Sequence, residues 1–264
     1  MGTRRGASDL GLVVDWQWEF RGPGVVVQTR VDTVALDLGN RLSPGVIDQH
    51  QDASLGQSTA DLVLRRDDLV YDHLMQPWLN RADDGQELSG RSWRPIIVTH
   101  RAPDFDGIVA ALLCMELIEN GEFPSWAESL VSLASAVDQA RVRDLGIPEV
   151  NPKSIFYAFY AFDETSTDEQ RSIRGMELIR HEATSLSAGK DRPLQVADWL
   201  GEEAGAWTAL DAVAQTVGEQ LEQDRAVYEG ELAQGLHQRR KITLPCFEGG
   251  ALGLIEVHAM VTRV

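Results

Sequence analysis

Up to residue 99, the pattern of hydrophobic and polar residues predicts a series of short strands. Over residues 14–20 apolar side chains alternate with polar ones, which is the period of a half-buried strand. Gly, Pro or Asp separate four further apolar runs, each of which indicates a strand: residues 25–29, 33–38, 45–47 and 95–99. The last run, Pro-Ile-Ile-Val-Thr, has the uninterrupted apolar character of a buried strand.

Between the last two of these runs, and again after residue 99, the pattern changes to that of helices. Residues 58–61, Ser-Thr-Ala-Asp, are a capping-box pattern that opens a helix through about Arg66. Residues 107–119 predict a second helix, which Asn120-Gly121 closes. Since strands alternate with helices, we predict an α/β fold in which helices flank a mainly parallel sheet.

The C-terminal part of the chain has a different pattern. From about residue 165 it is helical, and an apolar stripe at helical spacing continues over 206–238. Residues 242–247 and 251–260 predict two strands around a Glu-Gly-Gly turn, and therefore a terminal β-hairpin. We predict two domains, residues 1–160 and 161–264. The 206–238 stripe would serve equally well in a homodimer interface or as a lid over a core.

Composition narrows the class of protein. The chain has 264 residues and a formal charge of −17, which weighs against wrapping a long duplex but not against binding a short oligonucleotide or nucleotide. It contains no stretch of roughly 18 apolar residues and no N-terminal secretory signal, so no membrane partner is predicted. We expect a cytoplasmic protein in which both cysteines, Cys114 and Cys246, are reduced.

The most informative segment is residues 99–107, Thr-His-Arg-Ala-Pro-Asp-Phe-Asp-Gly, between a predicted strand and a predicted helix. In an open α/β sheet such a turn lies at the carboxyl edge, where ligands bind. His100 and Asp104 are close enough in this loop to share one cation. Asp106, two residues on, can point at a second cation.

Three other polar groups follow apolar runs. Asp37 follows one strand, Asp48-Gln49-His50-Gln51 follows another, and Asp138 closes a later apolar run. A carboxylate such as Asp37 can bridge two metal ions because it has two oxygens and no competing donor. Each residue alone is an ordinary loop former, but together they predict a divalent metal site.

These segments resemble the motifs of the DHH phosphoesterase superfamily, which are a His-x-x-x-Asp-x-Asp loop, a strand-end Asp, an Asp-His-His triplet and a later Asp. The resemblance covers residues 34–140. It implies two ions, Mn²⁺ or Mg²⁺, and a water that attacks phosphorus in line. It implies that the first ion is bound by His100, Asp104 and Asp37, and the second by Asp37, Asp106, Gln49 and Asp138. It also implies two catalytic roles: His50 would face the substrate phosphate, and Asp48 would orient its neighbours.

The sequence departs from the family pattern in two ways. Gln49 stands where the triplet has its middle His, and an amide oxygen is a neutral, weaker ligand, so we expect a more weakly bound second ion and activity that is reduced or lost. The strand-end Asp and the triplet also precede the residue 100–106 loop, which comes first in the usual order. A circular rearrangement keeps the site in space if the strands remain adjacent.

Several residues near these motifs have two interpretations. Arg101 and Arg41 could meet a phosphate, for which a guanidinium is well shaped, or could be solvated loop residues. Ser58-Thr59 falls where relatives carry small hydroxyl residues after the triplet, and we expect Thr59 to contact substrate. For His73 we expect a structural role in a helix. Trp16 and Trp18 could stack on bases, although packing in the core or in an interface is the interpretation we favour.

We therefore expect a metal-dependent phosphohydrolase that cleaves a phosphodiester in a short oligonucleotide or nucleotide. Residues 1–160 would form the metal-binding phosphoesterase domain, and residues 161–264 a substrate cap. One alternative is a degenerate nucleotide-binding or regulatory module, weakened by Gln49. A second is a pyrophosphatase, which would be expected to bring a cluster of Lys and Arg, whereas residues 239–241 are the one compact basic run of the C-terminal half. A structural scaffold that binds no metal is the third.

Overall fold

The structure is a computed structural model. It describes residues 4–22, 24–50, 58–146, 154–155, 167–201, 226, 230, 238–248 and 251–261. Contacts divide the chain into two units, Met1–Ala214 and Gln215–Val264. The predicted domain boundary after residue 160 falls outside the described residues and stays a prediction.

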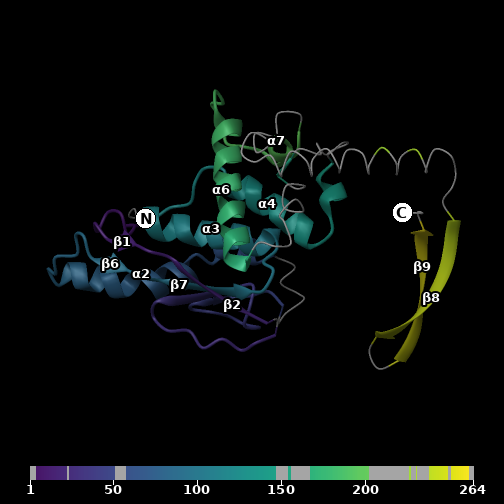
Figure 1. The fold of residues 1–264 in the computed structure, drawn as a ribbon, viewed down its shortest axis with the longest axis horizontal. Coiled ribbons are helices and arrows are strands. Elements are labelled where there is room, and N and C mark those ends of the chain that lie inside the picture. The colour runs from purple at the N-terminus through teal and green to yellow at the C-terminus, as the bar shows by residue number, and fades with distance from the viewer. Residues whose placement is uncertain are drawn as a thin grey trace. The chain divides into compact units, whose positions relative to one another are not determined.

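A five-stranded sheet forms the centre of the first unit (Figure 1). All its strands are parallel to their neighbours except β4, which is antiparallel to β5. The prediction of a mainly parallel sheet flanked by helices is confirmed. In spatial order the strands are β2 (Gln17–Arg21), β7 (Ile96–His100), β3 (Thr33–Leu36), β5 (Val46–Ile47) and β4 (Leu42–Ser43).

The order of the strands keeps the predicted site together. Strand β7, which ends at His100, lies between β2 and β3, although it comes after both in the sequence. In register, Ala35 pairs with Val98 and Leu36 pairs with Ile47, so β7, β3 and β5 end at the same edge. The adjacency that a rearranged motif order requires is therefore present.

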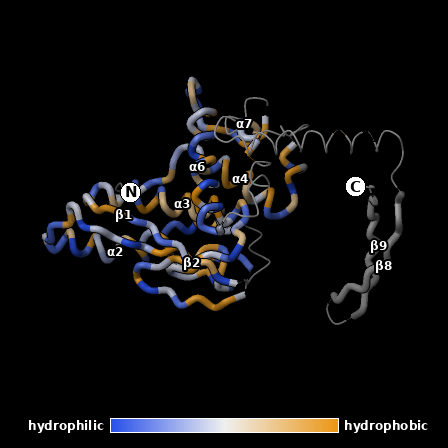
Figure 2. The backbone as a smooth tube through the Cα atoms, in the orientation of Figure 1, coloured by the Kyte–Doolittle hydropathy of each residue, from blue (hydrophilic) through white to orange (hydrophobic). Residues whose placement is uncertain are grey.

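Helices α1 (Thr59–Arg65), α2 (Asp68–Asp83) and α3 (Phe105–Asn120) pack against β3 and β5. Most of α3 is buried, and Gly121 ends it in a left-handed conformation. Helix α4 (Ala127–Asp138) packs on α1 and α3. In Figure 2 hydrophobic stretches gather around α3, α4 and the strands, in the middle of the unit.

The remaining elements of the first unit extend this core. Helix α6 (Asp168–Ser187) packs across α3, as Figure 1 shows in green, and α7 (Val196–Leu200) packs on α4. A 3₁₀ turn, η2 (Val142–Leu145), follows α4. A separate two-stranded parallel sheet joins β1 (Val13–Val14) to β6 (Ser92–Trp93).

The loop between β2 and β3 covers the face of the sheet opposite the helices. Its Val27 packs on residues of three strands, namely Ala35, Val46 and Val98. The predicted strand over 25–29 is wrong, because within the described residues this segment pairs with no strand and the side chains of Val25 and Val26 are 42% and 73% exposed. The segment crosses the face of the sheet instead of lying along its edge, and this packing overrides the strand propensity of three valines.

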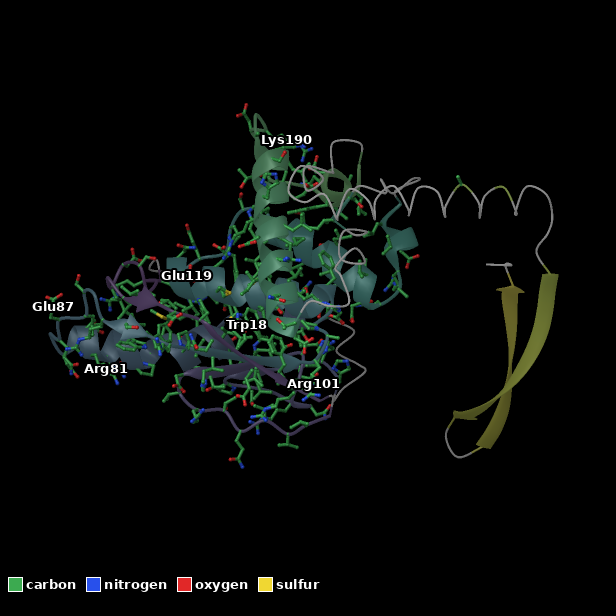
Figure 3. All side chains as sticks on the ribbon, in the orientation of Figure 1. Trp18, Arg81, Glu87, Arg101, Glu119 and Lys190 are labelled. Carbon is green, nitrogen blue, oxygen red and sulfur yellow. The ribbon has the colours of Figure 1, made fainter. Side chains whose placement is uncertain are left out.

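The tryptophan-rich N-terminal segment packs as expected. The predicted strand over 14–20 is divided between β1 and β2. Trp16 and Trp18 pack against the core, and the Trp16 indole N–H donates to Glu119 at 2.8 Å. Figure 3 labels Trp18 and Glu119 on the side of the sheet that the helices cover. Core packing of both indoles is confirmed.

The second unit contains the predicted hairpin. Strands β8 (Gln238–Glu248) and β9 (Ala251–Val261) pair antiparallel, with Gln238 opposite Val261. The predicted helical stripe over 206–238 lies almost wholly outside the described residues. Among the helices that the structure describes, none combines the length and the apolar character needed to cross a membrane.

Candidate metal centre

Two groups of possible metal ligands meet at the carboxyl edge of the sheet. Asp37, His100 and Asp104 form one group, and Asp37, Asp48 and His50 form the other. In each group the donor atoms lie within 4.8 Å of one another. Asp37 belongs to both groups, which is the arrangement expected of a bridging carboxylate.

Asp37 has an unusual backbone conformation immediately after β3. Its φ is +56°, in the left-handed region that Asp and Asn tolerate better than most residues. Its side chain is buried, and its Oδ2 lies 3.0 Å from His100 Nε2, whereas its Oδ1 lies 3.6 Å from His50 Nδ1. The two carboxylate oxygens of Asp37 therefore serve different neighbours.

The ring of His100 is oriented by the backbone. Its Nδ1 lies 2.9 Å from the carbonyl oxygen of Arg101, so Nδ1 donates and Nε2 faces Asp37. Metal-binding histidines are oriented in this way, with the second ring nitrogen donating to a carbonyl or carboxylate. The hydrogen bond with Asp37 raises the pKa of His100 to about 9, although burial opposes the shift. Burial works to raise the pKa of Asp37, but His100 outweighs it and the net shift is downward.

Asp104 is held by the start of α3. It is the N-cap residue, and its Oδ1 accepts from the backbone N–H of Gly107 at 2.9 Å. A Cβ at Gly107 would lie 3.5 Å from Asp104 Oδ1, 3.7 Å from His100 Nε2 and 3.8 Å from Asp37 Oδ2. The missing side chain of Gly107 thus leaves open a space that all three donors border, and the three residues fit a cation there.

Asp106 and Asp138 lie near the centre but, among the described residues, join neither donor group. Asp106 is 2% exposed, and its oxygens accept from the N–H groups of Thr59 and Ala60 at 2.8 and 3.1 Å. Burial raises the pKa of Asp106 well above its usual value, and the charges of Asp37 and Asp104 add to the shift. Burial and the same two charges raise the pKa of Asp138. Crowded carboxylates of this kind are stabilised by a bound cation.

In the second donor group Asp48 orients His50. The buried Asp48 accepts from the backbone N–H groups of Asn40 at 2.7 Å and of His50 at 2.9 Å. Its Oδ1 also lies 2.7 Å from His50 Nδ1. Burial works to lower the pKa of His50, but the hydrogen bond with Asp48 and the charge of Asp37 give a net upward shift. Asp48 thus has the orienting geometry that the family resemblance implies.

Gln49 and Thr59 complete this side of the centre. The Gln49 amide N–H donates to Asp37 Oδ1 at 3.3 Å, and the Thr59 hydroxyl lies 3.1 Å from the same oxygen. The hydroxyl of Thr59 also contacts Gln49 Oε1. Because Thr59 is fully buried, it lies behind the donors, and its contacts hold Asp37 and Gln49.

The two predicted phosphate contacts, Arg101 and Arg41, are exposed in loops that follow β7 and β3. The Arg41 Nη2 donates to the carbonyl of Val27 at 3.0 Å. Figure 3 labels Arg101 at the end of the unit opposite Glu87, which lies in the loop after α2.

The sequence assigns Asp168 to the start of a helix and not to the metal site, but its Oδ1 accepts from the N–H of Ala102 at 2.8 Å. The start of its helix could be predicted, and Thr167 and Gln170 do form a capping box there. A contact across 66 positions left no signal in the sequence. Asp168 therefore adds a residue from the C-terminal half of the chain to the surroundings of the centre.

Outside the centre, His73 behaves as expected. His73 Nε2 lies 2.9 Å from the Arg30 carbonyl and 3.0 Å from the Thr33 carbonyl, so it donates to backbone acceptors, and its structural role is confirmed. Cys114 is a buried free thiol, and burial raises its pKa.

Chemically, the centre offers carboxylate oxygens and imidazole nitrogens that could bind a metal ion. These donors are arranged around one shared carboxylate at a ligand-binding edge of the fold. A scan of protein-family models and searches of curated proteins and of solved structures find no match to this chain.

Proposed function

We propose that the protein is a metal-dependent phosphohydrolase that cleaves a phosphodiester in a short oligonucleotide or nucleotide. The observation that supports this most directly is Asp37, one carboxylate shared by two donor groups at the carboxyl edge of the sheet. A pair of ions bridged in this way suits phosphoryl transfer, where the metals neutralise charge around phosphorus. The resemblance of residues 34–140 to the DHH phosphoesterases points to the same chemistry.

The first ion, Mn²⁺ or Mg²⁺, would be held by Asp37, His100 and Asp104. Two carboxylates and one imidazole suit these harder cations better than a thiolate-rich set would. The second would be held on the side of Asp37 that faces Asp48 and His50. There the Gln49 N–H donates to Asp37 Oδ1, so this position would bind its ion more weakly.

The protein's own groups would bind and orient the substrate. The His50 side chain is 59% exposed, and Asp48 holds its Nδ1, so the other ring nitrogen can face a substrate phosphate. The upward shift in the pKa of His50 favours the protonated form, which would donate to a phosphoryl oxygen. The exposed Arg101 would contact a neighbouring phosphate of an oligonucleotide.

The test is Mn²⁺-dependent hydrolysis of a short fluorescent oligonucleotide and of bis-p-nitrophenyl phosphate by wild type, Gln49→His and Asp104→Ala. We expect Gln49→His to increase turnover about 10-fold, because imidazole is the stronger ligand, and Asp104→Ala to abolish it. Asp84→Ala, which removes an exposed carboxylate after α2, should behave as wild type. If none of the proteins hydrolyses either substrate or binds Mn²⁺, the proposal is wrong.

The hydrogen bond from Gln49 to Asp37 also favours a second candidate, a nucleotide-binding regulatory module. In that case the weakened second position would leave binding intact but remove turnover. Tight nucleotide binding in Mn²⁺ without hydrolysis, in wild type and in Gln49→His, would favour the module over the enzyme.

A further inference from the structure

We infer that Asp168 is a positioning residue for the candidate metal centre: from helix α6 it orients the peptide group that in turn orients His100. The inference rests on the proposed function, since it assigns a role in binding the first ion. Its evidence comes from a different part of the chain, because α6 begins 64 residues after the N-cap of α3 at Asp104.

One peptide group links Asp168 to His100. The carbonyl of Arg101 lies 2.9 Å from His100 Nδ1, and the N–H of Ala102, in the same peptide group, donates to Asp168 Oδ1 at 2.8 Å. A peptide group is planar, so its N–H and its carbonyl turn together. The carboxylate of Asp168 therefore fixes the direction of the oxygen to which His100 donates.

The loop needs such a fixed point because its conformation is unfavourable by itself. Ala102 has φ +52°, a left-handed value that is uncommon for a residue other than Gly, Asn or Asp. Alanine has no polar side chain to stabilise this conformation. The preceding N–H, that of Arg101, donates to the Arg21 carbonyl at 2.9 Å, so β2 and α6 hold the loop from two sides.

Asp168 itself is well anchored. The capping box of Thr167 and Gln170 fixes the start of α6, and the Ser172 hydroxyl donates to the Asp168 carbonyl at 2.9 Å. Further along α6, Arg180 pairs with Glu116 of α3 at 2.9 Å. Because α3 also carries Asp104 at its N-cap, α6 is tied to the helix that presents one ligand and to the loop that presents another.

The experiment compares Asp168→Ala with Asp168→Asn, whose side-chain oxygen can still accept from Ala102. Glu169→Ala is the matched control, since it removes an exposed acidic residue from the same helical turn. We expect Asp168→Ala to weaken Mn²⁺ binding, measured by calorimetry, about 10-fold, which is the loss usual for residues that orient a metal ligand. Asp168→Asn and Glu169→Ala should bind Mn²⁺ as wild type does.

Amide hydrogen exchange of the metal-free proteins is the second measurement. The Ala102 amide should be protected in wild type, in Asp168→Asn and in Glu169→Ala, and should exchange about 10-fold faster in Asp168→Ala. Unchanged protection in Asp168→Ala overturns the inference whether or not the protein binds Mn²⁺. Equal Mn²⁺ affinity of Asp168→Ala and wild type overturns it too. So does an Asp168→Asn variant that binds Mn²⁺ as weakly as Asp168→Ala, because the negative charge of Asp168 would then explain the loss of affinity without the hydrogen bond to Ala102. Wild type that binds no Mn²⁺ overturns the proposed function, while exchange still decides whether Asp168 holds the loop.

Discussion

The two sides of Asp37 differ in how their donors are used. On the His100 side, the backbone orients the ligands while leaving donor atoms directed at a common space: Nδ1 of His100 is bonded to a carbonyl and Nε2 faces Asp37. On the His50 side, Asp48 accepts from two backbone N–H groups and from His50 itself. There Gln49 also donates to the Asp37 oxygen that a second ion would need.

A cation requires lone pairs, so this difference has a direct consequence for binding. The His100 side borders the open space beside Gly107, where His100 Nε2 can bind a cation once it releases the proton that it shares with Asp37. On the His50 side, the oxygens of Asp48 and Oδ1 of Asp37 already accept hydrogen bonds from N–H groups. We therefore expect similar residue types around one shared carboxylate to give a stronger and a weaker metal position, distinguished by the hydrogen bonding around each ligand.

The largest expected effect comes from removing what the two sides share. Asp37→Asn keeps the size of the side chain, and Asn tolerates the left-handed backbone at this position. It removes the negative charge from both positions, so the loss of Mn²⁺ affinity should exceed the roughly 10- to 100-fold loss typical of orienting residues. Calorimetric titration with Mn²⁺ measures this loss.

Asp48→Asn is the comparison variant for Asp37→Asn, because it alters only the His50 side. It should leave the stronger Mn²⁺ binding step intact and affect only the weaker step. If Asp37→Asn binds Mn²⁺ as wild type does, the shared-carboxylate assignment fails. If Asp48→Asn removes the stronger step, the order of the two positions is reversed.

The sequence predicted which side chains form the centre better than it predicted the contacts that these side chains make. Strand β7 and helix α3 have unambiguous apolar patterns with polar residues at their junction, so these patterns alone place His100 and Asp104 at the carboxyl edge. The pairing of β7 with β3 could only be postulated from the rearranged motif order. It depends on which strands are adjacent, and that is a long-range property.

Two results could not be predicted because they depend on tertiary contacts. Asp106 has the position of a metal ligand in its motif, but its oxygens are bonded to the start of α1. The three valines of 25–27 have strand propensity, but one of them packs onto the face of the sheet and the segment forms a loop. In both cases the local pattern was unchanged, and a partner distant in sequence determined the outcome.

The next effect is on the stability of the metal-free protein. His100 has a folded-state pKa of about 9 against an ordinary value of 6.5, so its pairing with Asp37 stabilises the fold fully below pH 6.5 and is lost as pH rises through about 9. The folded-state pKa of Asp37 lies below its ordinary value of 3.8, so the same pairing is lost again as the pH falls below 3.8 and through that folded-state pKa. The loss at high pH should be on the order of 2–3 kcal/mol.

Urea unfolding in EDTA at pH 6 and at pH 9.5 measures this loss. Wild type should lose stability between the two conditions, and His100→Gln should lose much less. His50→Gln should keep the pH dependence of wild type, because the more exposed His50 is screened by solvent. A His100→Gln variant with the wild-type pH dependence would show that the pair with Asp37 does not stabilise the fold.

The smallest expected effect is a difference in KM between variants of two arginines, Arg101, which follows His100, and Arg41, which follows the strand-end Asp37 in the sequence. In the described part of the chain the Arg101 guanidinium has no hydrogen bond or ion pair, whereas that of Arg41 is bonded to the Val27 carbonyl. Arg101→Ala should therefore raise KM for the oligonucleotide about 3-fold without changing Mn²⁺ affinity, and Arg41→Ala should raise it less. At about 1 M salt the effect should disappear, because surface charges are then screened within about 3 Å. A larger KM effect for Arg41→Ala would place the bound oligonucleotide over the His50 side, where the weaker ion would then have to support its cleavage.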